Sequence, residues 1–475
     1  MNSRRSILVG AATLLAAGLA VRIAVGVAFP NWYWNDQVYQ TLEPAHSWLF
    51  GYGQLPWEFR EGLRSWILPG LLGAVMKLTA PLAEGSTGYL AGCTVFLSAL
   101  SLIPAAVCLH WHEREYRWTD LLAAFAPLVW MELIYFAPKA LYETFSAHLF
   151  IGALFLARFP RKTRWRLYAG GALLGLCCAV RIQLIPGAVA GIVAIALVAD
   201  DSHRRFSGLV VGLLAGLALG GLIDWITWGA PFESIVNNYH ENIVQNRAAE
   251  WGSSPATAYL HWMWKVSPLG TAMIGAATLV GLRLWPALAW PALTLFAAHS
   301  AIDHKEYRFL YPVLVLGAAM VGLGAARLTE WSDDLLPMRH ARGLVAVVLG
   351  LSILGNSVHA AATFRLDTKG EELSELNWTR RRGIFLAFRH LSTRSDLCGV
   401  GIRSSHHVGG YSYLHRDIPI VTTARSIDLA SERRFDAYVA IEPARWGESA
   451  GPFRRNRCVE DVCLYIRPGG CRDSG

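Results

Sequence analysis

Apolar stretches of about 20 residues recur along most of the chain, and this feature limits the fold more than any other. Hydrophobic residues make up 53% of the 475 positions and charged residues only 16%, whereas soluble domains carry about 25% charged residues. An apolar run of that length is what a helix needs to cross a lipid bilayer. The sequence therefore predicts an α-helical polytopic membrane protein surrounded by membrane lipids.

About eleven apolar segments are expected to span the membrane. A further apolar piece, residues 66–82, is assigned to the outer surface. Counting it as a span would place the basic sequence RKTRWR (161–166) outside, against the preference of Lys and Arg for cytoplasmic loops. The external loops are then residues 29–65 and 227–266. The expected spans are residues 6–28, 89–109, 119–137, 141–158, 167–184, 186–199, 207–226, 267–282, 284–300, 309–326 and 343–361.

The first of these segments follows Arg4 and Arg5, so it is either a cleaved signal peptide or an uncleaved first span. Its apolar run continues past Arg22 to Phe29, which is long for a signal peptide and favours the span. The net charge of +8 fits the excess of basic residues in cytoplasmic loops. No basic and aromatic soluble module is present, so nucleic acid is not expected as a partner.

The polar tail is expected to form a small soluble α/β domain outside the cytosol, residues 363–475, after a membrane domain of residues 1–362. Short β-branched and aromatic runs predict strands at 418–423, 436–441 and 463–467. No Cys-x-x-Cys pair has a matching partner, so a zinc site is not predicted. In an oxidising space, one or two disulfides are expected among the four cysteines of the tail. These are Cys398, Cys458, Cys463 and Cys471.

The first external loop carries more acidic, basic and aromatic residues than a connector needs. It predicts paired amphipathic helices on the membrane surface, one over 37–50 with Glu43 and His46, and a second short helix that carries Arg64. Asp36 precedes the first helix. It is either the N-cap of that helix or a carboxylate held at the lipid–water boundary, where it can take a proton from a hydroxyl.

The decapeptide DHKEYRFLYP (303–312) places five ionisable side chains at the outer edge of a predicted span. Charges at such a depth are costly unless they have partners or a function. They form either a structural charge network or a binding site for an anion such as a phosphate, which suits Arg and Lys. The five are Asp303, His304, Lys305, Glu306 and Arg308.

Two long motifs in this order resemble glycosyltransferase family 22, which contains the mannosyltransferases of GPI-anchor and asparagine-linked-glycan assembly. Residues 36–72 resemble the opening of the family, with LEPAH (42–46) at its Leu-Glu-x-x-His element. Residues 303–312 are similar to its His-Lys-Glu-x-Arg-Phe hallmark, and residues 252–264 to its external-loop element. The similarity is greatest to the branch that adds the third GPI mannose. One departure is Gln37, where the family usually has a second acid.

The resemblance implies the multi-span glycosyltransferase C fold and an inverting transfer of a sugar, with mannose taken from the resemblance alone. The donor would be a polyprenyl- or dolichyl-phosphate sugar, and the acceptor a glycolipid or glycan. The lipid-phosphate-linked sugar is a co-substrate, so no cofactor is expected. The sequence has no cluster of aspartates that would suggest a bound metal, so no metal is expected either. The site would face the periplasm at a bacterial inner membrane, or the lumen of the endoplasmic reticulum in a eukaryote.

The resemblance and the position of the loop select Asp36 as the general base. The departing phosphate needs cations, for which Lys305 and Arg308 are the first candidates and Arg64 and Arg181 the second. Arg181 also fits a snorkelling residue at the end of its span, and a tryptophan such as Trp264 also fits an interfacial anchor. Supporting roles toward the substrate are assigned to Glu43, His46, His304, Glu306, His261 and Trp264.

Two rival functions stay open at this point: a transporter or flippase of lipid-linked sugar, and a non-catalytic subunit of a glycan-assembly complex. A transporter is expected to show internal repeats with interrupted helices in matching halves. The sequence shows no such repeat, and its polar residues concentrate on one predicted face. The replacement of an acid by Gln37 keeps the non-catalytic subunit open.

Overall fold

The computed structural model describes residues 2–112, 117–158, 164–198, 201–335, 340–402, 410–423, 429, 433–441, 449–459 and 462–470. The chain divides into two compact units. The helical unit consists of residues 1–25, 61–68 and 96–376. The loop-and-tail unit consists of residues 26–60, 69–95 and 377–475. The predicted boundary at residue 362 stays a prediction.

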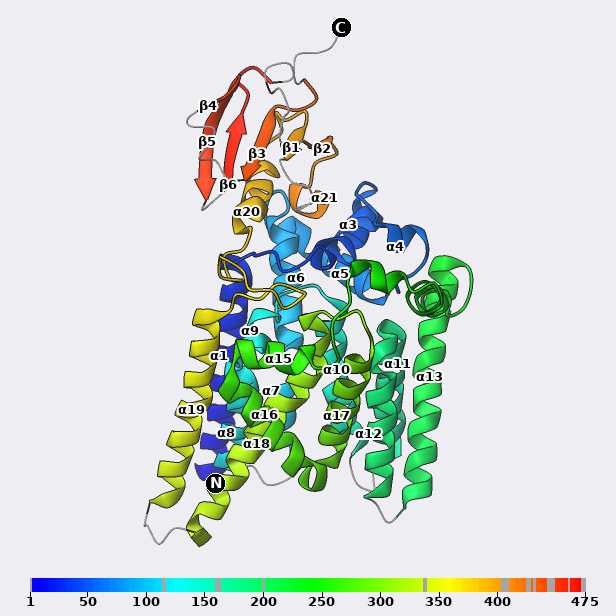
Figure 1. Ribbon diagram of the computed structural model, residues 1–475, viewed down its shortest axis with the longest axis vertical. Helices are drawn as coiled ribbons and strands as arrows, with labels where there is room; N and C mark the ends of the chain where they lie inside the picture. The colour runs from blue at the N-terminus through cyan, green and yellow to red at the C-terminus, as the bar shows by residue number, and fades with distance from the viewer. Residues whose placement is uncertain are drawn as a thin grey trace. The chain divides into compact units, whose positions relative to one another are not determined.

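The apolar segments that were expected to span the membrane are helical, which agrees with the predicted fold class (Figure 1). They form α1 (Asn2–Ala28), α6 (Thr87–Leu100), α7 (Ile103–Leu109), α8 (Trp118–Val129), α9 (Met131–Tyr135), α10 (Tyr142–Ala157), α11 (Arg164–Val180), α12 (Ile185–Leu197), α13 (Ser202–Trp228), α16 (Pro268–Leu284), α17 (Pro286–Ala301), α18 (Tyr311–Leu335) and α19 (Ala341–Thr363). Shorter elements of the helical unit are η2 (Ile182–Leu184), α14 (Glu233–Tyr239), η3 (His240–Val244), η4 (Arg247–Trp251), α15 (Ala258–Val266) and η5 (Tyr307–Leu310).

By length and composition, five helical stretches of the described chain could each cross a membrane. They are Arg5–Ala28, Thr87–Leu109, Ser202–Trp228, Tyr307–Ser332 and Ala341–Thr363. Shorter apolar helices such as α10 and α16 accompany them. The number of spans and their sidedness stay predictions, and part of the basic sequence 161–166 lies outside the described residues.

The helix α18 forms the centre of the helical unit. The apolar window of the stretch Tyr307–Ser332 is 89% buried, the largest fraction among the five candidate spans. Helices α7, α8, α10, α16, α17 and α19 all pack against it. The turn η5, which contains part of the DHKEYR motif, leads directly into α18. The motif is therefore attached to the most enclosed element of this unit.

Helices α11 and α13 lie side by side and approach each other at glycines (Figure 1). A Cβ atom on Gly216 would lie 1.9 Å from the carbonyl oxygen of Ala172, and one on Gly175 would lie 2.1 Å from that of Leu213. Small residues at such positions let helix backbones come close, which is how apolar helices associate in lipid. This close packing fixes α11, whose end carries Arg181.

The loop-and-tail unit brings the first external loop and the polar tail into one core. Trp32 and Val38 from the loop pack with Phe385, Val400 and Val439 from the tail. Backbone bonds reinforce the contact, because the amide of Trp32 donates to the carbonyl of Arg380 at 3.0 Å. The loop is therefore a structural part of this unit as well as a carrier of motif residues.

The predicted helix over residues 37–50 is broken in the structure. Helix α2 (Asp36–Tyr39) is one turn long, and α3 (Leu42–Phe50) starts after a kink at Thr41, which has φ −138° and ψ −65°. The N-cap prediction for Asp36 is wrong, since Asp36 is the first residue of α2 and Asn35 precedes it as the N-cap. The second loop helix is also shorter than predicted, because α4 (Trp57–Arg60) ends before Arg64. The apolar piece that follows forms α5 (Ile67–Thr79) and η1 (Ala80–Leu82).

The tail contains a six-stranded sheet with the order β2-β1-β3-β6-β5-β4. Strands β2 and β3 run parallel to β1, whereas β6 pairs antiparallel with β3 and β5. The predicted strands correspond to β2, β3 and β6, and the prediction missed the other three. The strands are β1 (Val400–Ile402), β2 (Ile420–Thr422), β3 (Ala437–Ile441), β4 (Ser449–Ala450), β5 (Phe453–Val459) and β6 (Val462–Ile466).

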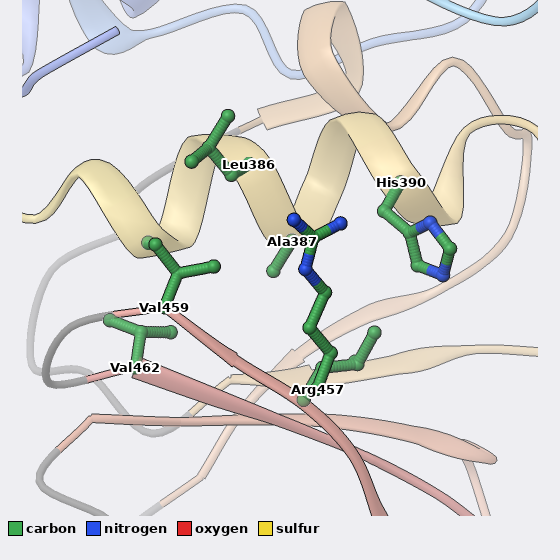
Figure 2. Close-up of a pocket in the computed structure, with 8 residues that line it drawn as sticks. Leu386, Ala387, His390, Arg457, Val459 and Val462 are labelled. Atoms are coloured by element: carbon green, nitrogen blue, oxygen red, sulfur yellow. The ribbon is translucent and has the colours of Figure 1, made fainter. Parts of the chain in front are cut away.

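Helix α20 (Arg382–Leu391) packs on β5 and β6 with its apolar side, and the short α21 (Gly410–Leu414) packs on α20. Figure 2 shows a hollow between α20 and these strands, where Arg457 extends beside Ala387 and His390. The hollow has room for about one water molecule. It is too small for a sugar or lipid ligand.

Disulfides are present in the tail, as expected for an oxidising space. Cys458 and Cys463 are bonded to each other across the β5–β6 pair. Cys398 is disulfide-bonded as well, while Cys471 lies outside the described residues. The four cysteines of the apolar segments, Cys93, Cys108, Cys177 and Cys178, are free and buried.

Candidate active site

The DHKEYR motif folds into an ordered charge network. The Nε atom of Arg308 lies 2.7 Å from Oε2 of Glu306, and the Nε2 atom of His304 lies 3.2 Å from Oε1 of the same carboxylate. Burial acts to raise the pKa of Glu306, but the charges of Arg308 and His304 outweigh it and hold that pKa below its usual range. Glu306 is therefore an anion that orients the two cations beside it.

Both ring nitrogens of His304 face oxygen acceptors. Nδ1 lies 3.2 Å from the carbonyl oxygen of Gly252, and Nε2 faces the Glu306 carboxylate. A neutral imidazole has one donor nitrogen and one acceptor nitrogen. The geometry therefore suits an imidazolium, which donates in both directions and adds a positive charge to the network.

Glu143, at the start of α10, lies between two arginines that come from different parts of the chain. Its Oε1 atom is 3.0 Å from Nη2 of Arg181 and 3.6 Å from Nη1 of Arg308. The three side chains are 2%, 7% and 4% exposed, respectively. Removal of one partner from a buried ion pair of this kind strongly destabilises the folded protein, because the other charge is left buried without compensation. We refer to Glu143, Arg181, His304, Glu306 and Arg308 as the arginine cluster.

Lys305 has a different environment from the arginines. Its Nζ atom donates to the carbonyl oxygens of Ser254, at 2.9 Å, and Ile302. The amide of Ser254 donates in return to the carbonyl of Asp303 at 2.9 Å. Together with the bond from His304 to Gly252, these contacts join the two motifs that were quoted as family elements, residues 252–264 and 303–312. Phosphate binding by Lys305 stays a prediction.

Arg64 belongs to a segment that is held by the region around α13 and α14. Its carbonyl oxygen accepts a bond from the indole of Trp228 at 3.0 Å, and the neighbouring Glu61 pairs with Arg247 at 3.1 Å. The charge of Arg64 acts on Arg181, so it lies near the arginine cluster and adds to its positive field. Arg64 and Arg181 were the second-choice cations of the sequence prediction.

His261 and Trp264 lie on the exposed side of α15. Trp264 is 55% exposed, whereas the other side of the helix buries Tyr259 and Trp262. This position suits the anchor interpretation of Trp264, because interfacial tryptophans contact lipid headgroups. Neither side chain is part of the buried arginine cluster, and their contact with substrate stays a prediction.

Glu43 and His46 are in the loop-and-tail unit, where α3 packs on α21. The Glu43 carboxylate accepts bonds from the amides of Gln54, at 3.1 Å, and Ser412. Burial raises the pKa of Glu43, although these amide bonds oppose the effect. The carboxylate thus ties the turn after α3 to the start of α21. Its role toward the substrate stays a prediction.

His46 completes this contact through a second imidazole. Its Nδ1 atom lies 3.1 Å from the carbonyl oxygen of Tyr52, to which it donates, and its Nε2 atom lies 3.0 Å from Nδ1 of His415. His415 must then be the donor in this second bond. Burial lowers the pKa of His46 to about 3 and also lowers that of His415. We refer to Glu43, His46, Tyr52, Ser412 and His415 as the histidine cluster.

Gln37, the departure from the family pattern, has a local structural role. Its Oε1 atom accepts from the amide of Tyr33 at 3.1 Å, and its Nε2 atom donates to the carbonyl of Asn31 at 2.9 Å. A carboxylate could make the first bond but has no proton for the second. The amide therefore closes the turn that leads into α2 and Asp36.

Three residues that these contacts single out were not among the site residues selected from the sequence: Glu143, His415 and Glu132. Glu132 accepts a bond from the hydroxyl of Tyr307 at 2.8 Å. A carboxylate inside a predicted apolar segment was the available signal for Glu132 and Glu143. His415 gave no signal, because its relation to His46 exists only in the folded chain. No group of three or more possible metal ligands was found within the described residues.

Comparison with known proteins agrees with these motifs. Residues 13–415 match the model of the Alg9-like mannosyltransferase family. The chain belongs to this family. It is therefore a membrane glycosyltransferase of the mannosyltransferase class, which confirms the family resemblance stated from the sequence.

Relatives within the Alg9-like family are similar over most of the chain. GPI mannosyltransferase 3 of Yarrowia lipolytica is 26% identical over 428 residues, which cover 86% of this chain and 76% of that one. GPI alpha-1,2-mannosyltransferase 3 of Xenopus laevis is 26% identical over 384 residues, 74% of this chain and 69% of that one.

Solved structures show the same fold at low sequence identity. ArnT from Cupriavidus metallidurans bound to undecaprenyl phosphate is 13% identical and aligns with a TM-score of 0.59 over 98% of this chain and 99% of that one. Its apo state aligns with a TM-score of 0.54. The predicted glycosyltransferase C fold is thus confirmed for this Alg9-like chain.

Proposed function

We propose that this enzyme transfers mannose from a polyprenyl- or dolichyl-phosphate donor, and that Arg181 and Arg308 hold the donor phosphate. The observation that carries the proposal is the buried guanidinium pair on the shared carboxylate of Glu143. Guanidinium groups offer forked donors that match phosphate oxygens. A lipid phosphate lies at the membrane surface, the depth at which the DHKEYR motif was predicted to lie.

The charge of the arginine cluster suits the charge that develops in the reaction. Three cations, Arg181, Arg308 and the His304 imidazolium, face the two carboxylates of Glu143 and Glu306, so one positive charge is in excess. Arg64 adds a further positive field. The donor phosphodiester carries one negative charge, and the departing lipid phosphate gains a second. A preorganised positive site stabilises such growth in the transition state.

The proposed chemistry is a single displacement at the anomeric carbon. The acceptor hydroxyl attacks C1 of mannose, the bond from C1 to the phosphate oxygen breaks, and the phosphate leaves with the electron pair. One displacement inverts the anomeric centre. We assign Asp36 as the base that takes the hydroxyl proton, and Lys305 and Arg64 as further donors to the phosphate.

The acceptor is proposed to be a glycolipid of the GPI type, because the similar relatives are named as GPI mannosyltransferases. The reaction would take place on the extracytosolic face, because the membrane topology predicted from the sequence puts both motifs there. This would be the lumen of the endoplasmic reticulum in a eukaryote and the periplasm in a bacterium.

Transfer by the purified full-length protein tests this proposal. The protein is incubated with radiolabelled polyprenyl-phosphate mannose and mannosylated glycolipid acceptors, and the product is separated and counted. We expect wild-type protein to transfer label and Asp36→Asn to lose at least about 100-fold in rate while it still binds the lipid donor. Glu250→Gln is a matched control, because it removes an exposed carboxylate of another predicted external loop to which no catalytic or binding role is assigned.

The outcomes separate the proposal from its rivals. Unchanged transfer by Asp36→Asn would remove Asp36 as the base. Donor binding without transfer by the wild type, for all acceptors, would favour a non-catalytic subunit. Movement of labelled lipid between the two leaflets of vesicle membranes, without transfer of the sugar, would favour a flippase.

A further inference from the structure

Arg181 and Arg308 have a second common contact besides Glu143, and this contact is the ring of Phe309. The Cζ atom of Arg181 lies 4.9 Å from the ring centroid, and that of Arg308 lies 5.2 Å from it. The His304 imidazole meets the same ring edge-on at a centroid distance of 5.8 Å. Cations within about 6 Å of an aromatic centroid are attracted by its quadrupole. One ring thus contacts both Arg181, which follows α11, and Arg308, which belongs to the DHKEYR motif.

The turn that carries Phe309 is firmly anchored. Its neighbours Tyr307 and Leu310 are fully buried in η5, with 0% exposure. The hydroxyl of Tyr307 donates to Glu132 at 2.8 Å, and its amide donates to the carbonyl of Thr368 at 2.9 Å. The backbone that carries the half-buried Phe309 ring is therefore held by contacts that do not involve the arginines.

The two guanidinium groups require an additional contact to fix their relative orientation, because they come from different elements and repel each other. Arg181 follows α11, whereas Arg308 lies in η5, and each charge acts on the other. Glu143 attracts both guanidinium groups but contacts the farther one at only 3.6 Å. A ring that faces both groups limits the orientations that they adopt. Side chains ordered before binding spare the ligand the entropic cost of ordering them.

We propose that Phe309 is a positioning residue for the donor, which holds Arg181 and Arg308 at the spacing that one phosphate group requires. The inference rests on the proposed function, because it takes the arginine pair as the phosphate site. Phe309 itself makes no bond to the phosphate. What it supplies is the aromatic face, so the inference predicts that aromatic replacements work and aliphatic ones do not.

Binding of undecaprenyl phosphate to the full-length protein in nanodiscs is the direct test. Phe309→Leu and Phe309→Met fill much of the volume without a π face, whereas Phe309→Tyr and Phe309→Trp keep the face. We expect the aliphatic pair to bind about 10-fold more weakly than wild type, because two cation–π contacts are lost. The affinity of the aromatic pair is expected to stay within about 3-fold of the wild-type affinity. Affinities are compared only among variants whose melting temperature equals that of the wild type.

Steady-state transfer gives a second readout. A loss of positioning raises the KM for the lipid donor about 10-fold in Phe309→Leu, and Phe309→Trp restores it. A merely structural role would instead reduce the fraction of active enzyme, which lowers kcat and leaves KM unchanged.

The failure of this inference is distinguishable from that of the proposed function. Wild-type affinity in Phe309→Leu and Phe309→Met, with weak binding in Arg308→Lys, would overturn the role of Phe309 alone. Wild-type affinity in Arg308→Lys and Arg181→Lys as well would show that the phosphate binds elsewhere and would overturn both. If an aliphatic variant fails to fold, the ranking of Tyr, Trp and the remaining aliphatic variant decides, since equal weakening in all would exclude the aromatic face.

Discussion

The arginine cluster and the histidine cluster are both buried and polar, yet their ionisable side chains respond to burial in opposite ways. In the arginine cluster, full charges stay and neutralise one another, with Glu143 and Glu306 between guanidinium groups. In the histidine cluster, burial lowers the pKa of His46 to about 3, so the imidazole is neutral at physiological pH, and backbone amides satisfy Glu43.

This difference agrees with a binding function for the arginine cluster, as proposed, and a structural function for the histidine cluster. Guanidinium groups have several donors, and a cluster with excess positive charge can exchange or add an anion with little rearrangement. The hydrogen bonds of His46 and Glu43 are all directed at the chain itself, toward Tyr52, Gln54, Ser412 and His415. The first cluster therefore suits the proposed donor phosphate, whereas the second holds the loop and tail together.

The same substitution in both clusters is expected to give the largest contrast. Glu143→Gln leaves Arg181 buried without its counter-ion and should cost about 3–5 kcal/mol of stability. Glu43→Gln keeps an oxygen for the amides of Gln54 and Ser412 and should cost about 1 kcal/mol. Thermal unfolding of the purified variants, followed by fluorescence, compares the two. Equal losses would contradict the distinction between a cluster held by ion pairs and one held by hydrogen bonds to the backbone.

Arg308→Lys tests whether the charged cluster serves catalysis. The lysine keeps the charge but loses the fork toward the phosphate and toward Glu306, and we expect transfer to fall about 100-fold, within the range for loss of one transition-state donor. Arg327→Lys is the matched control, because Arg327 lies on α18, the helix that follows the η5 turn of Arg308, and is 47% exposed. Rates from labelled donor and acceptor provide the measurement. A variant that transfers at the wild-type rate would refute a role for the guanidinium fork.

The histidine cluster is expected to make the loop-and-tail unit acid-sensitive. The pKa values of His46 and His415 lie below the usual value of 6.5 in the folded chain. Their contribution to stability is therefore complete above pH 6.5 and decreases as the pH falls toward the folded values, by up to about 1.4 kcal/mol per pH unit for each group.

Melting temperatures between pH 8 and pH 4.5 test this dependence, with His46→Gln as the variant. Glutamine cannot take up a proton in this range, so its curve should be flatter below pH 6.5. The other ionisable groups of the cluster, Glu43 and His415, are the same in both proteins, so the difference between the two curves reports on His46. A His46→Gln curve parallel to the wild type would show that the acid response arises elsewhere.

The smallest expected effect concerns Gln37. Replacement by Glu would place a carboxylate opposite the carbonyl of Asn31 and should cost about 1–2 kcal/mol of stability. If the amide only closes this turn, Gln37→Glu should not raise the rate of transfer. A faster variant would indicate that the second family acid contributes to the chemistry.

Much of the helical architecture was predictable, because lipid leaves few alternatives to helices for an apolar backbone. The loop helix over 37–50 was not, since its break at Thr41 serves the packing of α3 on α21, which involves residues more than three hundred positions away. Strand β5 was missed because its sequence FRRNRCV is mostly polar, and its pairing with β6 decides its structure.

The candidate site was predictable in part for a related reason. Arg181, His304, Glu306 and Arg308 could be chosen from motif and chemistry, and the structure brings them together. Glu143 links them through contacts between distant segments, which no local pattern encodes. The role of Gln37 likewise depended on the two backbone groups that it meets.

Arg22 gives the chain an order of assembly. It lies in the first apolar helix with 0% exposure and donates to the carbonyl oxygens of Pro127 and Leu128, both at 2.9 Å. Leu128 is made 106 residues later, so these two carbonyl groups are not present to accept bonds from Arg22 when α1 is made. Helix α1 therefore reaches its final packing only after α8 has been synthesised, although it precedes α8 by about ninety residues.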